Sequence, residues 1–229
     1  MTLHLAPHAK LVMIGDSVTD CERARPMGEG LFGAIGKGYV ANVDALLTVA
    51  YPDYAIRVVN MGCSGNNVRD LKNRWQSDVV DLQPDWVSVM IGINDVWRQF
   101  DLPRQPEGHL YLEEHTKTLE ELVTHTQPLV KGLVLLTPYY IELNRNDPMR
   151  AMMDRYGDAV KMIAAQHGTL LVDTQAAFDR VLTHYHPNAI AWDRVHPNHL
   201  GHMVLAHAFL EAIGYEWCRQ GQISCTRNA

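Results

Sequence analysis

Residues 11–20 read LVMIGDSVTD, an apolar run that ends in the turn sequence Gly-Asp-Ser. A short run of Leu, Val, Met and Ile bounded by Gly is typical of a strand that is buried on both faces. Such strands form parallel sheets, and ligands of open α/β sheets bind beyond the carboxyl ends of the strands. Ser17 is therefore either an ordinary turn hydroxyl or a nucleophile, and the choice depends on partners elsewhere in the chain.

Four further apolar runs repeat this pattern, at residues 56–59, 86–91, 133–136 and 170–172. Between the runs, apolar residues recur every three or four positions, which predicts helices with one buried face. These helical patterns cover residues 39–50, 68–82, 152–163 and 203–213. Strand alternating with helix about five times predicts an α/β fold, with a five-stranded parallel sheet between two layers of helices.

The rest of the chain offers no boundary between domains. Residues 97–109 and 183–195 are polar and interrupted by Pro or Gly, so we expect both segments to be surface loops. The 229 residues contain no internal repeat and no low-complexity linker. We therefore predict one domain that spans residues 1–229.

The composition is that of a globular protein with a sizeable core, since 47% of the residues are hydrophobic and 20% are charged. The formal net charge of −6 argues against nucleic-acid or anionic-membrane partners, which favour a basic surface. No apolar run approaches the roughly 20 residues that cross a bilayer, and the N-terminus lacks a signal-peptide pattern. We expect a soluble cytoplasmic protein.

The cysteines and histidines do not form a recognisable metal motif. The four cysteines have no CxxC spacing, and in a chain this long without an export signal we expect reduced thiols. Five histidines crowd near the C-terminus, but no carboxylate-bridged ligand set accompanies them, so we predict no metal site. The residues concerned are Cys21, Cys63, Cys218 and Cys225, and His184, His186, His196, His199 and His202.

A serine nucleophile needs a base to take its proton, and the base needs an acid to orient it. Asp193 and His196 are three residues apart, just before the last helical pattern, and Pro197 suits the first turn of that helix. This spacing lets the carboxylate accept from the imidazole Nδ1–H while the other ring nitrogen faces Ser17. The sequence therefore predicts a catalytic set of Ser17, His196 and Asp193.

Acyl transfer also needs hydrogen-bond donors aimed at the developing oxyanion. Asn94 follows the third predicted strand and offers a side-chain NH₂ group. The backbone N–H groups of Ser17 and Gly65 complete the predicted oxyanion hole, because Gly65 lets the backbone approach a substrate closely.

Four blocks of sequence carry a family resemblance: GDS with Ser17, GCSGN with Gly65, GIND with Asn94, and DRVH with the aspartate and histidine. They occur in the order found in GDSL-type, or SGNH, hydrolases, with Val18 where the family name has Leu. The longer strings GDSVTDCERARP, PDWVSVMIGINDVWRQFD and WDRVHPN closely resemble intracellular acetylxylan esterases of this superfamily. The similarity covers nearly the whole chain.

This resemblance implies a three-layer α/β/α sandwich of the flavodoxin-like kind, a homo-oligomer and no cofactor. It also implies a serine esterase that removes acetyl groups from xylo-oligosaccharides or related acetylated sugars through an acyl-enzyme intermediate. Ser17 would attack the acetyl carbonyl, and His196 would take its proton and later give it to the leaving hydroxyl. Asp193 would orient His196, while Ser17 N–H, Gly65 N–H and the Asn94 side chain would bind the oxyanion.

Other residues at the same rim have two interpretations each. Asp173 ends the fifth predicted strand and rivals Asp193 as the acid, although it also suits a cap of the next helix. Trp97 and Trp192 flank the GIND and DRVH blocks and are candidate sugar-stacking residues, or ordinary packing residues. The role of Arg98 is open. Asp16 and Asp95 are expected to hold their loops by accepting backbone hydrogen bonds.

Other functions remain to be weighed against the sugar deacetylase. An arylesterase, a thioesterase or a lysophospholipase would use the same catalytic residues, because the pocket sets the substrate. A non-catalytic sugar-binding module is disfavoured by the complete set of catalytic residue types. The glycine run GEGLFGAIGKGY, residues 28–39, departs from the phosphate-loop pattern because Lys37 is followed by Gly38, so we interpret it as a surface loop.

Overall fold

The computed structural model describes residues 2–217 and has a parallel sheet of five strands in the order β2-β1-β3-β4-β5. The strands closely match the predicted runs: β1 Lys10–Gly15, β2 Arg57–Gly62, β3 Trp86–Met90, β4 Gly132–Leu136 and β5 Leu170–Val172. Gly15 lies opposite both Gly62 and Met90, so the carboxyl ends of the three neighbouring strands meet at one rim.

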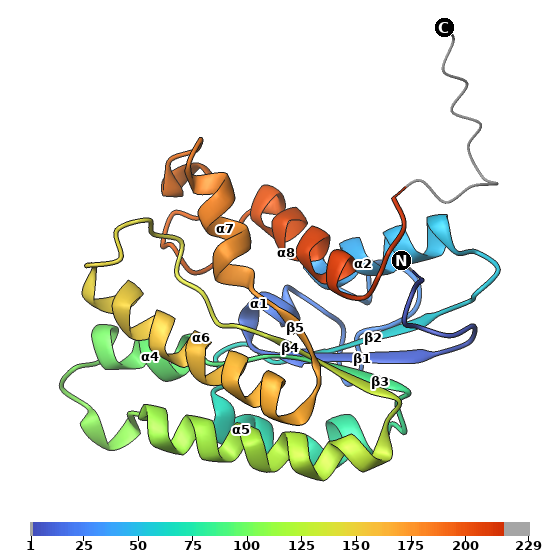
Figure 1. The fold of residues 1–229 in the computed structure, drawn as a ribbon, viewed down its shortest axis with the longest axis horizontal. Helices are drawn as coiled ribbons and strands as arrows, with labels where there is room; N and C mark the ends of the chain where they lie inside the picture. The colour runs from blue at the N-terminus through green and yellow to red at the C-terminus, as the bar shows by residue number, and fades with distance from the viewer. Residues whose placement is uncertain (1, 218–229) are drawn as a thin grey trace, which may run out of the picture.

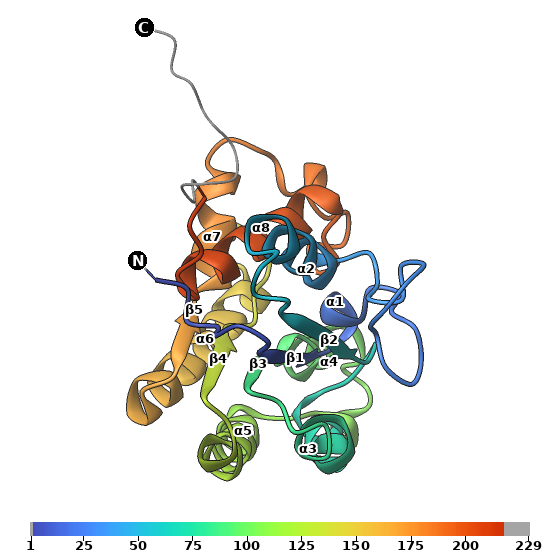
Figure 2. The ribbon, with the colours of Figure 1, turned by 90° about the vertical axis from the view of Figure 1, so that its right-hand side faces the viewer.

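Helices cover both faces of the sheet, which confirms the predicted α/β architecture (Figures 1 and 2). Side chains of β1 alternate between the two layers: Leu11 and Met13 join one core cluster, and Val12 and Ile14 join the other. The first layer contains α2 (Tyr39–Ala50), α7 (Thr174–Leu182) and α8 (His199–Ala212). The second contains α3 (Val68–Trp75), α5 (Leu112–Thr126) and the C-terminal half of α6 (Pro148–His167).

Short elements complete the connections. A helical turn, α1 (Ser17–Asp20), follows β1 directly, and a π-helical turn at Gln76–Val80 extends α3 over the rest of the predicted helix. Single 3₁₀ turns lie at Pro106–Gly108, Gln127–Leu129 and Pro187–Ala189. The expected loop at residues 183–195 is confirmed apart from the last of these turns. The helix α5 was not among the predicted segments.

The expected loop at residues 97–109 is wrong in its first part, because Trp97 to Asp101 belong to α4 (Ile93–Asp101). The helix starts at the rim after β3 and ends at Asp101, and the chain breakers Pro103 and Pro106 follow only after that point. A proline restricts the residue before it and has no such effect several residues upstream. Trp97 and Arg98 therefore lie on a helix that begins beside the strand ends.

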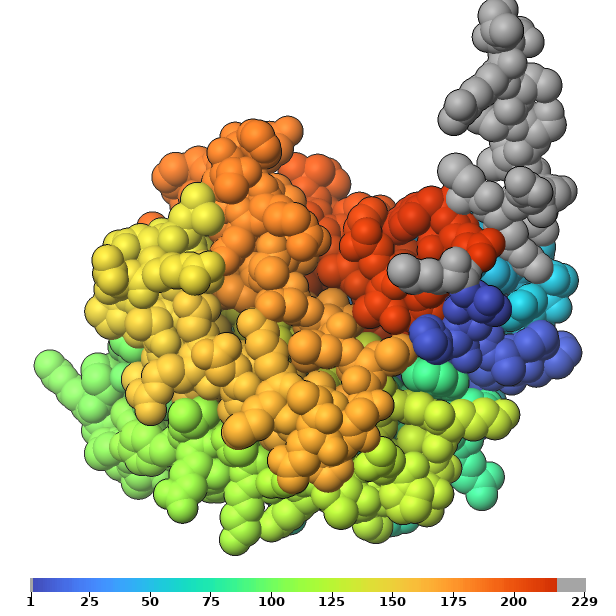
Figure 3. Space-filling model, in the orientation of Figure 1, coloured from blue at the N-terminus to red at the C-terminus, as the bar shows by residue number. Residues whose placement is uncertain are grey.

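The helices α6, α7 and α8 lie next to one another on one face of the molecule (Figure 3). Figure 3 shows the segments around α6 (yellow) and α7 (orange) side by side on one face, with α8 (red) next to α7. Contacts between α7 and α8 and between α4 and α6 hold these elements together. The loop of residues 193–198 leads into α8, and it therefore reaches the rim from the opposite end of the chain to Ser17.

Candidate active site

Ser17 lies at the start of α1, where the chain turns sharply at the end of β1. Gly15 permits this turn, because a Cβ at that position would lie 2.3 Å from Thr19 Oγ1 and 2.5 Å from the Met90 carbonyl oxygen. Asp16 caps the short helix by accepting from the Val18 N–H at 3.0 Å. The strand end and the cap together hold the Ser17 hydroxyl at the rim of the sheet.

The side chains of Ser17, His196 and Asp193 form a continuous hydrogen-bonded chain. Ser17 Oγ lies 2.8 Å from His196 Nε2, and His196 Nδ1 lies 2.6 Å from Asp193 Oδ2. The second carboxylate oxygen of Asp193 accepts from the backbone N–H groups of Val195 at 3.0 Å and His196 at 2.8 Å. This geometry fixes the ring: Nδ1 donates to the carboxylate, and Nε2 is free to accept the hydroxyl proton.

Hydrogen bonds stabilise the negative charge of the Asp193 carboxylate. Burial by itself raises the pKa of Asp193, but hydrogen bonds from the His196 ring and from two backbone N–H groups bring it below its ordinary value. The carboxylate is therefore ionised at neutral pH and stabilises a protonated imidazole. Three of the predicted residues, from segments about 180 positions apart in sequence, are thus brought into contact.

The other predicted oxyanion donors follow the next two strands: Gly65 lies in the loop after β2, and Asn94 lies in the first turn of α4 after β3. Gly65 has a φ of +82°, which favours glycine, and the space where its Cβ would point is open to at least 4 Å. Asn94 is buried, and its Nδ2 donates one hydrogen to the Asn66 carbonyl oxygen at 2.9 Å. The amide thus retains a second hydrogen, which is available for a substrate oxygen.

Arg98 orients the Asn94 amide, a role that the sequence did not reveal. Its Nη2 donates to Asn94 Oδ1 at 3.2 Å, while its guanidinium lies 4.6 Å from the ring centre of Trp97 and is ion-paired with Asp101. An arginine on the amide oxygen determines that the NH₂ group points the other way. Residues four apart lie side by side on a helix, so the spacing of Asn94 and Arg98 could have revealed this contact. It was missed because residues 97–109 were predicted to be a loop.

Arg74 is a second residue whose role the sequence did not indicate. From α3 it donates to the carbonyl oxygens of Gly15 at 2.9 Å and Met61 at 2.7 Å, and to Asn66 Oδ1 at 2.6 Å. One guanidinium therefore ties the ends of β1 and β2 to the loop that contains Gly65. Nothing in the sequence spacing distinguishes Arg74 from the surface arginines, because its partners come from three separate segments.

Asp16 holds its own loop, as predicted, whereas Asp95 is bonded to residues of other elements. Asp16 is fully buried, and this desolvation raises its pKa to about 7 despite the hydrogen bond from Val18 and the proximity of His196. Asp95 Oδ1 accepts from His115 Nδ1 at 2.9 Å and from the Val68 N–H at 3.4 Å. The buried pair of Asp95 and His115 links the start of α4 to α5 and α3.

The two tryptophans differ in their surroundings. Trp97 lies against His196, with 5.5 Å between the ring centres and an edge-on arrangement. Trp192 is 84% exposed, next in sequence to Asp193. Trp97 therefore lines the catalytic neighbourhood directly, whereas any substrate contact by Trp192 stays a prediction.

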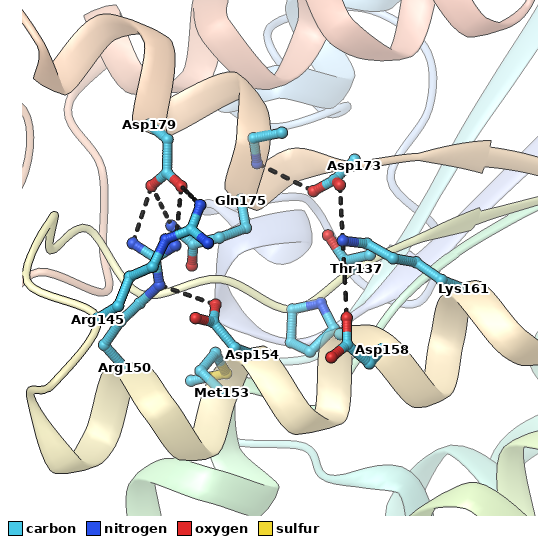
Figure 4. Close-up of a pocket in the computed structure, with 13 residues that line it drawn as sticks. Thr137, Arg145, Arg150, Met153, Asp154, Asp158, Lys161, Asp173, Gln175 and Asp179 are labelled. Atoms are coloured by element: carbon cyan, nitrogen blue, oxygen red, sulfur yellow. Dashed lines mark hydrogen bonds and ion pairs between the residues drawn. The ribbon is translucent and has the colours of Figure 1, made fainter.

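Asp173 lies in a different environment from Asp193. Its Oδ1 caps α7 through the Ala176 N–H at 2.9 Å, and its Oδ2 pairs with Lys161 at 2.7 Å (Figure 4). Both oxygens are engaged away from His196. The cap role that the sequence offered for Asp173 is the one that the structure shows.

Asp173 lines a polar cavity of about 170 Å³ between α6 and α7. Arg150 is buried there and pairs with Asp179 and Asp154, each at 2.8 Å, and Arg145 lies 3.8 Å from Asp179 (Figure 4). Because the cations and carboxylates of this cavity are paired with one another, it has the character of a structural ion-pair network that fastens α6 to α7.

His202 is the buried member of the histidine-rich C-terminal region, and ordinary hydrogen bonds hold its ring. His202 is buried and accepts from the Tyr39 N–H at 3.1 Å, while its Nε2 lies 3.5 Å from Cys21 Sγ. Burial lowers the pKa of His202 to about 4, so the ring is neutral and its Nε2 carries the proton. Within residues 2–217, no group of three or more His, Cys, Asp or Glu side chains is placed to hold a metal ion.

Two of the four cysteines lie in the described part of the chain. Cys21 and Cys63 have free thiols, and Cys218 and Cys225 lie outside residues 2–217. No helix in the described part of the chain combines the length and the apolar character that a bilayer crossing requires. The glycine run is a surface loop as predicted, with Phe32 fully exposed near its tip.

Comparison with known proteins gives one consistent result. The family model of GDSL-like lipases and acylhydrolases matches residues 13–204. An acetylxylan esterase of Geobacillus stearothermophilus is 62% identical over 210 residues, which cover 92% of this chain and 96% of that protein. A crystal structure of an acetylxylan esterase from the same organism superimposes with a TM-score of 0.94 at 60% identity, over 96% of this chain and 100% of the other.

Other solved structures agree with this result. An α/β hydrolase from the metagenome of Lake Arreo, Spain, matches with a TM-score of 0.92 and 58% identity, over 93% of this chain and 98% of the other. For the Geobacillus enzyme, solved structures include variants described as catalytic mutants, in which a serine, a histidine or an aspartate is replaced by alanine.

Proposed function

The chain belongs to the GDSL-like lipase/acylhydrolase family, and from that premise we propose that it removes acetyl groups from xylo-oligosaccharides or related acetylated sugars. The observation that carries the proposal is the hydrogen-bonded chain from Ser17 Oγ through His196 to Asp193. Its donors and acceptors are already in the order that ester hydrolysis requires. The identity of 62% to an acetylxylan esterase supports the choice of acetyl esters.

Acylation begins when Ser17 Oγ attacks the acetyl carbonyl carbon and His196 Nε2 takes the hydroxyl proton. The carbonyl oxygen becomes an oxyanion that the Ser17 and Gly65 N–H groups and the Asn94 amide stabilise. Asp193, kept ionised by its three hydrogen bonds, stabilises the protonated imidazole. The tetrahedral intermediate then collapses as the bond between the acetyl carbonyl carbon and the sugar oxygen breaks.

His196 gives its proton to the departing sugar oxygen, which leaves Ser17 acetylated. Deacylation repeats these steps with water in place of the hydroxyl. His196 takes a proton from water, the resulting hydroxide attacks the acetyl carbonyl, and acetate departs as Ser17 Oγ recovers the proton.

Turnover of 4-nitrophenyl acetate by wild-type protein and by Ser17→Ala tests the mechanism. We expect the variant to lose at least about 10³-fold in kcat, since it keeps the oxyanion donors but has no nucleophile. Trapping with a serine-directed fluorophosphonate should add one label to the wild type at Ser17 and none to the variant. Near wild-type turnover by Ser17→Ala would refute the proposal.

A substrate panel tests the proposed substrate class. We expect acetylated xylo-oligosaccharides to be hydrolysed with higher kcat/KM than butyryl, octanoyl or thioester substrates. A preference for long acyl chains would favour a lysophospholipase, and a preference for thioesters would favour a thioesterase. We further propose that the protein acts in the cytoplasm, which fractionation of cells that produce it tests. We also propose that it is a homo-oligomer, which light scattering on the purified protein tests.

A further inference from the structure

A surface groove of about 340 Å³ lies between the C-terminal half of α4 and the N-terminus of α6. Trp97, Phe100 and Asp101 of α4 form one wall, and Tyr140 and Asp147 contribute to the other. The two helices pack against each other and lie side by side in Figure 1. The groove is distinct from the ion-pair cavity between α6 and α7.

Both walls of the groove are joined to the loop that carries His196. On one side, the ring of Trp97 contacts the ring of His196, with 5.5 Å between their centres. On the other side, the residues that flank Tyr140 are bonded to the same loop. The Ile141 N–H donates to the Arg194 carbonyl oxygen at 2.9 Å, and the Tyr139 hydroxyl donates to the Val195 carbonyl oxygen at 3.0 Å.

The direction of proton transfer determines which half of the substrate lies here. His196 Nε2 protonates the leaving oxygen, so the alcohol part of the ester must lie on the His196 side of Ser17. The proposed oxyanion donors for the acetyl carbonyl are Gly65, in the loop after β2, and Asn94, in the first turn of α4. We infer that the groove between α4 and α6 binds the sugar that carries the scissile acetyl group, an inference that rests on the proposed function.

The lining of the groove matches the two kinds of surface on a pyranose ring. Aromatic rings of Trp97, Phe100 and Tyr140 offer flat apolar faces for the C–H face of a sugar. Asp147 uses Oδ1 to cap α6 through the N–H groups of Met149 and Arg150, which leaves Oδ2 to accept from a sugar hydroxyl. A carboxylate at this place also disfavours leaving groups that carry phosphate.

The inference is tested by comparing two acetyl esters with different alcohols. Acetylated xylotriose has a leaving group that fills the groove, and ethyl acetate has one that is too small to do so. We expect Phe100→Ala to lower kcat/KM for the acetylated xylotriose by about 10-fold, mainly through KM, because a stacking face is lost. We expect Asp147→Asn, which keeps an oxygen for the helix cap, to lower it by about 5-fold. Turnover of ethyl acetate should stay within about 2-fold for both variants.

Matched controls separate the groove from general effects. Phe32→Ala makes the same replacement at a fully exposed position that does not line the groove, and Asp173→Asn changes another helix-capping aspartate. Neither variant should alter the ratio of kcat/KM for acetylated xylotriose to kcat/KM for ethyl acetate. If Phe100→Ala and Asp147→Asn lower kcat/KM equally for both esters, or for neither, the assignment of the groove as the sugar site is refuted. The proposed esterase activity is unaffected by that result. A wild type that hydrolyses ethyl acetate but not acetylated xylotriose instead overturns the proposed substrate class, and the groove assignment with it.

Discussion

Replacement of Asp16 by asparagine should change how the stability of this protein depends on pH. Asp16 is fully buried next to the proposed nucleophile, and desolvation raises its pKa from 3.8 to about 7. The folded state therefore holds the proton more tightly than the unfolded state. The stabilisation from this protonated carboxyl is fully present below about pH 4 and is lost as the pH rises through about 7.

The magnitude follows from the two pKa values. Each unit of difference corresponds to about 1.4 kcal/mol, so ionising Asp16 in the folded protein costs about 4 kcal/mol above pH 8. Asp16→Asn keeps an oxygen that can accept from the Val18 N–H but cannot ionise. Its new NH₂ group takes the place of Oδ2, which has no hydrogen-bond partner in the described residues, and costs roughly 1–3 kcal/mol at every pH.

The measurement is urea unfolding of wild type and Asp16→Asn at pH 4.5 and pH 8.5, at one protein concentration. We expect the free energy of unfolding of the variant minus that of the wild type to be higher at pH 8.5 than at pH 4.5 by up to about 4 kcal/mol, because only the wild type loses stability as Asp16 ionises. Asp158→Asn, at a side chain that is 76% exposed, is the control and should differ little from wild type at either pH. A difference between Asp16→Asn and wild type that is the same at both pH values would refute the burial argument.

Two further predictions concern the catalytic groups. Asp193→Asn should lower kcat for 4-nitrophenyl acetate by about 10⁴-fold, because its amide NH₂ group would face His196 Nδ1 and favour the tautomer in which Nε2 carries the proton. Asp173→Asn should stay within about 2-fold, and a larger loss in this variant would reverse the assignment of the acid. Arg98→Met should lower kcat by about 10-fold through misorientation of the Asn94 amide, and should have little effect when Asn94 is already alanine. Equal losses from Arg98→Met in both backgrounds would show that Arg98 acts independently of the amide.

Much of the fold was predictable because the strands of a doubly covered parallel sheet leave a simple pattern. Each of the five strands is a short apolar run, and burial on both faces removes the need for polar alternation. The failure at residues 97–109 has an equally simple cause. Residues 97–101 of α4 are mostly polar and only partly buried or exposed, at the edge of the proposed site, so they look like those of a loop.

The sequence by itself determined the residue types of the proposed site and their order along the chain. Ser17, Gly65, Asn94 and the Asp193–His196 pair stand at strand ends or just before a helix, where local patterns place them at one rim. Those signals are local, because a strand end, a turn glycine and an i, i+3 pair each depend on a few neighbouring residues.

Only the tertiary structure decided how these groups are held. The contact of Ser17 with His196, the hold of Arg74 on three segments and the orientation of Asn94 by Arg98 depend on the packing of distant segments. The same is true of the groove between α4 and α6, and of the burial that sets the pKa of Asp16. Hydrogen bonding and desolvation are short-ranged in space but not in sequence, so no local pattern records them.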